Sequence, residues 1–179
     1  MGQDSICTQP RTTVDTPSHV RAWSLRDWIG LGSFIAVCFG AAGLGSVLTG
    51  VSVNDWYPGL QKPSWNPPGW VFGPVWSALY LSMAVSAWLV WRRRGLSGAA
   101  RPLGLFALQL VLNVAWSGLF FGLRSPGVAL AEIVLLWGAI LATALSFRRE
   151  TPLAGWLLAP YLLWVAFAAV LNLALWKMN

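Results

Sequence analysis

Residues 60–76 read LQKPSWNPPGWVFGPVW and are denser in Trp and Pro than the apolar segments on either side. Three of these prolines, Pro63, Pro67 and Pro68, have no N–H to donate and hold φ near about −65°, so the segment before Gly69 cannot be the interior of a helix. A Pro pair directly before an apolar run is instead typical of a helix start, where the first turn needs no N–H partners. We therefore predict a rigid, aromatic loop that leads into a membrane helix at Gly69.

The composition is that of a membrane protein. Of the 179 residues, 56% are hydrophobic and 10% charged, and the mean hydropathy is +0.60, whereas soluble domains are roughly a quarter charged. The sequence therefore predicts an integral membrane protein with the lipid bilayer as its partner. The net charge of +6 does not indicate a nucleic-acid partner, because no segment interleaves Arg or Lys with aromatic residues on a solvated face. The two cysteines, Cys7 and Cys38, form neither a disulfide framework nor a metal-ligand spacing.

Five apolar segments are each long enough to cross a bilayer, which takes about 20 helical residues. We predict an all-α integral membrane protein, a compact bundle of five transmembrane helices within residues 27–179. The predicted spans are residues 28–50, 70–91, 102–122, 126–147 and 152–176, with a long Trp/Pro loop at 51–69. Prolines stand at three of the helix starts, Pro102, Pro126 and Pro152. Residues 1–26 are polar and aperiodic, so we expect a disordered tail and no signal peptide.

Lys and Arg fall mainly on one side of the predicted bundle. The tail, residues 92–101 and residues 148–149 together hold nine of the twelve, and the other side holds Lys62, Arg124 and Lys177. Cytoplasmic loops carry the excess of basic residues. We therefore expect a cytoplasmic N-terminus, and a periplasmic Trp/Pro loop if the membrane is a bacterial inner membrane.

Two polar features lie inside the spans. Gln109, Asn113 and Trp116 are spaced i, i+4, i+7 and share one face of the third span. Amides at this depth either bond to a neighbouring helix, contributing about 1 kcal/mol, or face a ligand. Glu132 is the only acid inside a span, which makes it a candidate functional residue. It lies less than two turns into the fourth span, so a second interpretation is that it reaches the headgroup region near Arg124.

The tryptophans divide by depth. Four lie near span ends and fit interfacial belts: Trp28, Trp91, Trp156 and Trp176. Trp76 and Trp164 lie deeper, and each is either a core residue or part of a site. Trp76 shares a helix face with Phe72 and Tyr80, and Trp164 shares one with Tyr161, Ala168 and Leu171. Wide aromatic planes beside small residues suit a flat, largely apolar ligand. The sequence shows no hydrolase, redox or metal-site motif, and no obligatory cofactor is expected.

The W-N-P-P run at residues 65–68, following Q-K-P-S, resembles the signature of the translocator protein family, also called tryptophan-rich sensory proteins. Five further blocks look like family positions in family order: Trp56-Tyr57, Trp76-x-x-x-Tyr80, Gln109-x-x-x-Asn113-x-x-Trp116, Phe120-Phe121-Gly122 and Pro160-Tyr161-x-x-Trp164-x-x-Phe167. The likeness runs from about Trp28 to the C-terminus. By this resemblance, Trp76 and Trp164 match the two tryptophans that flank the family's tetrapyrrole and drug site, and the implied ligand is a porphyrin or haem.

These observations and the resemblance together define a predicted ligand site in the bundle, capped by the Trp/Pro loop. Its residues are Trp65, Trp70, Phe72, Trp76, Tyr80, Asn113, Trp116, Val128, Glu132, Leu135, Tyr161, Trp164, Ala168 and Leu171. The family's cholesterol-recognition pattern is incomplete, because Leu173 stands where a Tyr is expected before Lys177. A homodimer is expected, with Gly118-x-x-x-Gly122 or the small residues of the first span as its contact.

Four functions remain open from the sequence. The protein binds tetrapyrroles or other flat apolar molecules for their transport, sensing or turnover. Alternatively, it is a small proton-coupled exporter that uses Glu132, or an enzyme that degrades porphyrin in light through Trp76 and Trp164. The fourth function is that of a scaffold protein that acts by forming a dimer.

Overall fold

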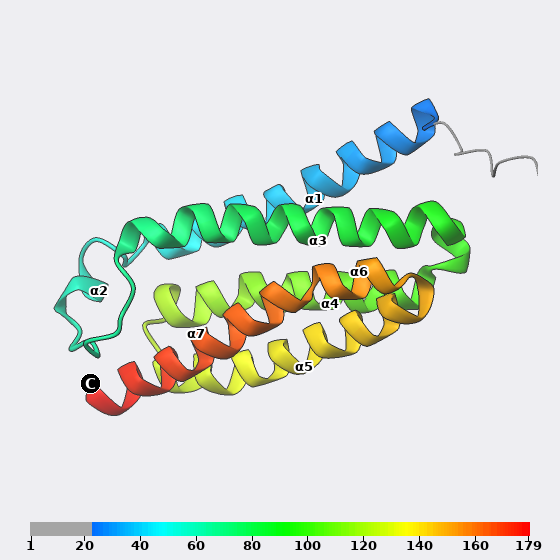
Figure 1. The fold of residues 1–179 in the computed structure, drawn as a ribbon. Coiled ribbons are helices and arrows are strands. Elements are labelled where there is room, and N and C mark those ends of the chain that lie inside the picture. Colours follow the sequence, from blue (N-terminus) through cyan, green and yellow to red (C-terminus); the bar gives the residue numbers. More distant parts are fainter. Residues whose placement is uncertain (1–22) are drawn as a thin grey trace, which may run out of the picture.

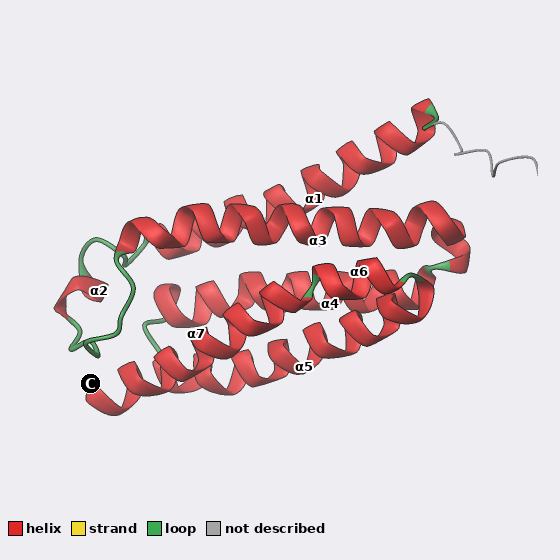
Figure 2. Ribbon diagram, viewed as in Figure 1, coloured by secondary structure: helices red, strands yellow, loops and turns green. Residues whose placement is uncertain are grey.

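The computed structural model describes residues 23–179, and this part of the chain is helical without strands (Figures 1 and 2). Its elements are α1 (Leu25–Gly50), α2 (Trp56–Gly59), α3 (Gly69–Gly98), α4 (Ala100–Ser117), the π-helix η1 (Gly118–Gly122), α5 (Pro126–Glu150), α6 (Pro152–Leu157) and α7 (Ala159–Met178). Five stretches are long and apolar enough to cross a membrane: α1, α3, α4 with η1, α5, and α6 with α7. The predicted all-α bundle of five membrane helices is confirmed.

The start of α1 is fixed by a pair of reciprocal hydrogen bonds. Ser24 Oγ accepts from the Asp27 main-chain N–H at 3.3 Å, and Asp27 Oδ2 accepts from the Ser24 N–H at 2.9 Å. This capping box satisfies N–H groups that the first helical turn leaves unpaired. α1 therefore begins at Leu25, inside the stretch predicted as tail and three residues before the predicted span. The remainder of the predicted tail, residues 1–22, lies outside the described residues.

The Trp/Pro loop ends where predicted. Pro68 precedes α3 with φ −59° and ψ 143°, and the helix begins at Gly69. The loop contains one helical turn that was not predicted, α2. Asp55 caps it, since its carboxylate accepts a hydrogen bond from the Trp56 N–H at 2.6 Å.

The regular helix of α3 continues through the arginines to a kink at Gly95, so the prediction that it stops after Trp91 was wrong. Arginines mark the membrane boundary without ending the helix, because their long side chains lie back over neighbouring groups. Arg92, for example, lies over the Trp88 ring at 5.3 Å. The regular helix breaks only at Gly95, with φ 69° and ψ 179°, a conformation open essentially to glycine alone.

The third span ends in a widened turn. The Leu123 N–H bonds to the Gly118 carbonyl at 2.8 Å, five residues back, which defines the π-helix η1. Gly118 lies against α1, where an added Cβ would lie 3.6 Å from Leu48 Cδ1. The first glycine of the suggested dimer motif is thus in contact with a neighbouring helix of its own chain.

The fifth span is broken at Leu158 into α6 and α7, although one continuous helix was predicted over residues 152–176. Pro160 explains the break, because it has no N–H to bond the carbonyl four residues earlier. Pro74 differs from Pro160 in this respect, because it lies near the start of α3 and leaves that helix uninterrupted.

Two serines of α3 fix α6 in place. Ser82 Oγ donates to the Leu157 carbonyl and Ser86 Oγ to the Ala154 carbonyl, each at 2.6 Å. Because these acceptors belong to the main chain near the break, α3 satisfies carbonyl groups at the C-terminal end of α6.

In the assembled bundle, α1 lies along α3 and α4, and α5 lies against α4, α6 and α7 (Figure 1). α6 also contacts α3, whereas α7 diverges from α3 toward the end that carries the Trp/Pro loop. The core contains buried residues such as Met83, Phe106 and Ile140. α1 is peripheral and buries only Gly30, Cys38 and Gly45.

Candidate functional site

Aromatic rings fill the widening space between α3 and α7. Three ring pairs span it, with centroids 5.9 Å apart for Trp65 and Phe167, 5.9 Å for Phe72 and Trp164, and 6.2 Å for Trp76 and Tyr161. We call these six residues the aromatic ladder. The two inner pairs form in this order because α3 and α7 are antiparallel and their ring residues lie about one turn apart on each helix. Trp65 extends the series from the Trp/Pro loop. The ladder leads from the Trp/Pro loop into the middle of the bundle.

Asn113 holds the inner end of the ladder. The Tyr80 hydroxyl donates to Asn113 Oδ1 at 2.5 Å, and Asn113 Nδ2 donates to the Tyr161 oxygen at 3.0 Å. All three side chains are buried. The rings of Trp76 and Tyr80 are 5.6 Å apart, so this network adjoins the ladder directly. Asn113 of α4 therefore bonds to both α3 and α7, as expected of an amide that joins neighbouring helices. These bonds lie beside the predicted site.

The Trp/Pro loop covers the outer end and is held by its own polar groups. The Tyr57 hydroxyl donates to Asn66 Oδ1 at 3.2 Å, and Lys62 Nζ lies over the Tyr57 ring at 4.7 Å. Burial raises the pKa of Tyr57, so its hydroxyl stays protonated and able to donate. The Gln61 main-chain N–H also bonds Asn179 Oδ1 at 2.9 Å, which ties the loop to the end of α7.

A second set of contacts ties the loop to η1. Ser52 Oγ donates to the Phe121 carbonyl, and Arg124 pairs with the Asp55 carboxylate at 2.8 Å. The Trp56 N–H, with a smaller effect from Arg124, holds the pKa of Asp55 below its ordinary value. Asp55 is therefore ionised at neutral pH, as the ion pair requires.

Trp116 belongs to a different aromatic group. Its ring stacks on Phe120 at 5.1 Å and meets Phe121 edge-on at 6.1 Å, and Trp56 approaches Phe120 at 5.8 Å. The Trp116 Nε1–H is buried without a hydrogen-bond partner among residues 23–179. Trp116 thus lies under α2 and is not brought into the ladder with Trp76 and Trp164.

Glu132 is buried inside the bundle, with 8% of its surface exposed. Both carboxylate oxygens lack a hydrogen-bond partner within the described part of the chain. Arg124, the cation suggested from the sequence, is paired with Asp55 instead. An unpartnered carboxylate inside a span keeps Glu132 a candidate functional residue.

The other predicted site residues divide by exposure. Trp70, Val128 and Leu135 face outward, with 77%, 53% and 66% of their surfaces exposed, and none meets the ladder. Leu171 is buried against Phe120, and Ala168 is half-buried at the edge of the core. The sequence prediction left Phe167 out of the site. Its spacing of three residues from Trp164 would have placed it on the same helix face.

The comparisons with known proteins agree with the resemblance seen in the sequence. The translocator proteins of Sus scrofa and Homo sapiens are each 49% identical over 126 residues, which are 69% of this chain and 75% of theirs. The tryptophan-rich sensory protein of Cereibacter sphaeroides is 36% identical over 153 residues, 86% of this chain and 93% of its own. A sequence profile of the TspO/MBR family matches residues 34–177. Since that match contains the loop, the ladder and nearly all of the five spans, the chain belongs to the TspO/MBR family.

Proposed function

We propose that the protein binds a tetrapyrrole, such as a porphyrin or haem, or another flat apolar molecule at the aromatic ladder, for its transport, sensing or turnover. One observation carries the proposal: α3 and α7 diverge, and the space between them is bridged by aromatic rings instead of close helix contacts. Ring pairs contribute about 0.5–1.5 kcal/mol beyond the burial of their area. A planar ligand placed between the two rings of a pair would stack on one ring from α3 and one from α7, so contact with both helices would be kept.

The names of relatives support the same class of function. The 49% identical proteins are called translocator proteins, and a 36% identical one is called a tryptophan-rich sensory protein. Translocation and sensing both require reversible binding of a small molecule. The ladder offers the ring area that binding of an apolar molecule needs.

Trp76→Phe and Trp164→Phe are each expected to weaken porphyrin binding about five-fold. Phenylalanine keeps a π-face but loses area and the N–H donor, at a cost of about 1 kcal/mol, which corresponds to that change in affinity. The measurement is a porphyrin titration in nanodiscs, followed in the dark by quenching of tryptophan fluorescence.

Trp70→Phe and Trp156→Phe are the matched controls for this titration. Both rings are mostly exposed, at 77% and 61%, and Trp156 lies under Arg148 at 5.3 Å at the other end of the bundle. Neither change is expected to alter the affinity. Equal losses in the controls and in the ladder variants would show that the ladder is not the binding site.

A second candidate function is proton-coupled export, which the unpartnered Glu132 carboxylate favours. In proteoliposomes, wild-type protein should then accumulate porphyrin in response to a pH gradient, and Glu132→Gln should lose that response while keeping binding. Uptake that is the same with and without the gradient would exclude this function.

The charge asymmetry is expected to orient the protein with the Trp/Pro loop outside the cell. Lys62 and Arg93 lie at opposite ends of the bundle, because α3 starts at the loop and carries Arg93 near its far end (Figure 1). In a variant without Cys7 and Cys38, Lys62→Cys should react with a membrane-impermeant thiol reagent in intact cells and Arg93→Cys should not. A permeant reagent should label both, and the reverse pattern with the impermeant reagent would contradict the orientation.

A further inference from the structure

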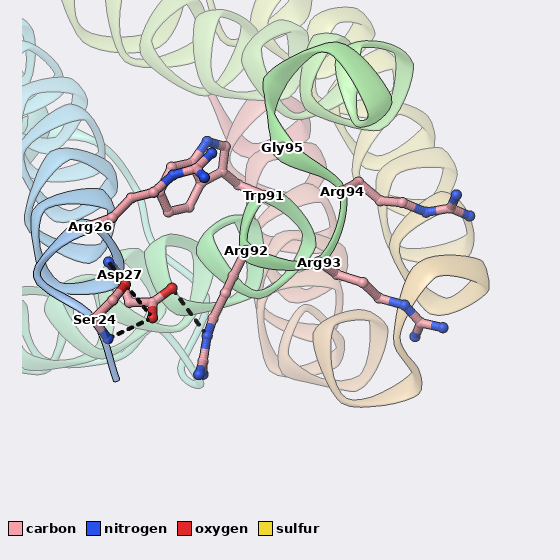
Figure 3. A pocket seen from close by; sticks show the side chains of 8 residues that line it. All are labelled: Ser24, Arg26, Asp27, Trp91, Arg92, Arg93, Arg94 and Gly95. Carbon is pink, nitrogen blue, oxygen red and sulfur yellow. Dashed lines mark hydrogen bonds and ion pairs between the residues drawn. The ribbon is translucent and has the colours of Figure 1, made fainter. Parts of the chain in front are cut away.

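Two adjoining cavities lie at the end of the bundle opposite the Trp/Pro loop. The first holds about 310 Å³ and is lined by Ser24, Arg26, Asp27 and residues 91–95 (Figure 3). The second holds about 540 Å³ and continues along α1 and α3. Arg26 and Trp91 line both cavities, so the two are parts of one depression with a polar and an apolar section.

The polar section carries excess positive charge. Its eight lining residues include four arginines, Arg26, Arg92, Arg93 and Arg94, against a single carboxylate. That carboxylate, Asp27, already pairs with Arg92 at 3.3 Å and accepts from Ser24 at 2.9 Å. Arg94 pairs with the Glu150 carboxylate at 2.6 Å and Arg93 donates to the Glu150 main-chain carbonyl, whereas Arg26 has no carboxylate within ion-pair distance among residues 23–179. The section therefore suits an anion.

Trp91 forms the wall that the two sections share. Arg26 lies over its ring at 5.4 Å (Figure 3), and a Cβ added to Gly30 would come within 2.1 Å of the indole. The ring is thus fixed against α1 by a glycine that leaves space for it. Arg26 alone lies along Trp91, whereas Arg92 turns toward Asp27, and Arg93 and Arg94 extend away from Trp91 (Figure 3).

The apolar section follows α1 into the region that the bilayer covers. Ile29, Phe34, Val37 and Leu96 line it together with the Trp91 ring. From Ile29 to Val37 the helix rises about 12 Å, at about 1.5 Å per residue. A groove of this length, starting beside an arginine at the membrane surface, matches the first part of a lipid acyl chain. Leu96 reaches the groove because the chain reverses direction at Gly95.

We propose that this depression binds one anionic phospholipid. Its phosphate lies beside Arg26, which has no carboxylate within ion-pair distance among residues 23–179, and one acyl chain lies along Ile29, Phe34 and Val37. A free phosphate would use only the polar section, and a neutral lipid only the apolar one. Basic pockets between membrane helices on the side richer in Lys and Arg suit such headgroups. The lipid would join α1, which buries few residues of its own, to α3.

The proposal is tested by native mass spectrometry of the full chain with phosphatidylglycerol and phosphatidylcholine of identical acyl chains, added in equal amounts. Phosphatidylglycerol should be retained preferentially. Arg26→Gln should weaken its binding about five-fold, the effect of removing one arginine near an anionic headgroup. Arg26→Lys should keep most of the preference, and the thermal midpoint without lipid shows whether each variant folds.

Arg101→Gln is the matched control, because Arg101 is exposed at the same end of the bundle and lines neither cavity. A loss as large as that of Arg26→Gln would mean a diffuse surface charge and overturn the proposal. Equal retention of the two lipids by the wild-type protein would also overturn it. So would displacement of phosphatidylglycerol by an equal concentration of glycerol phosphate, since that outcome leaves an anion site without a chain.

Discussion

Asn113→Leu is expected to lower the free energy of unfolding by about 1–3 kcal/mol. The change removes one amide but leaves two buried hydroxyls, those of Tyr80 and Tyr161, without their partner. An unpaired buried polar group costs about 1–3 kcal/mol, and interhelical bonds in membranes average about 0.6 kcal/mol with a maximum near 1.7. Two such bonds are lost here, so the middle of the range is expected. Reversible unfolding in mixed micelles gives the value.

Gln109→Leu is the control on the same helix, one turn earlier. Gln109 is as buried as Asn113, but it makes only a weak contact, from Nε2 to Met83 Sδ at 3.8 Å, and its Oε1 lacks a partner within residues 23–179. Replacing it with an apolar side chain of similar size should leave stability unchanged or raise it. If both variants lose the same amount, the cost lies in helix packing and not in the hydrogen bonds of Asn113.

Gly155→Ala should also destabilise the protein by about 1–3 kcal/mol, the usual cost of overfilling a well-packed contact. Gly155 lies where α6 meets α5. An added Cβ would lie 2.6 Å from Arg148 Cβ, 2.9 Å from Arg148 Cα and 2.9 Å from the Ala144 carbonyl oxygen. These atoms belong to the backbone or are attached to it, so they cannot turn aside as the end of a side chain would. The two helices would have to separate.

The control for this change is Gly138→Ala in α5. Nothing lies within 4 Å of a Cβ built at Gly138, and alanine is favoured over glycine inside a helix by about 0.5–1 kcal/mol. This variant should therefore be as stable as the wild type or slightly more so. A thermal midpoint for Gly155→Ala that matches the one for Gly138→Ala would contradict the close contact of α5 and α6.

The sequence predicted helix starts better than helix ends. Pro68 and Pro126 mark the beginnings of α3 and α5 within a residue, because proline removes an N–H that only a first turn can spare. The arginines after Trp91 predicted the end of the second membrane helix. Charge sets where a helix leaves the bilayer, however, and does not stop its backbone hydrogen bonding, so α3 continues to the kink at Gly95. The break at Leu158 was predictable in principle, since Pro160 lies inside the predicted span.

Spacing predicted which aromatic side chains share a helix face, whereas their assignment to a ligand site came from the family resemblance. Trp76, Tyr80, Tyr161 and Trp164 repeat at three- and four-residue intervals, and the structure brings them together. Val128, by contrast, was assigned inward and faces outward. A helix that is apolar on every side gives no hydrophobic stripe from which to deduce its rotation. In such helices the inward face is set by contacts with neighbours, which the sequence of one chain does not specify.

The break at Leu158 divides one membrane crossing into two parts that contact α3 in different ways. α6 is bound to α3 through two hydroxyl-to-carbonyl hydrogen bonds, from Ser82 and Ser86. α7 meets α3 through rings, and ring contacts tolerate changes of spacing and tilt that hydrogen bonds do not. Tyr161, near the break, is hydrogen-bonded to Asn113, so a change in the tilt of α7 would move the outer ladder pair of Trp65 and Phe167 more than the inner pair. Spin labels on α3 and α7, placed beside the outer and the inner pairs, would measure whether the spacing of either pair changes when a ligand binds.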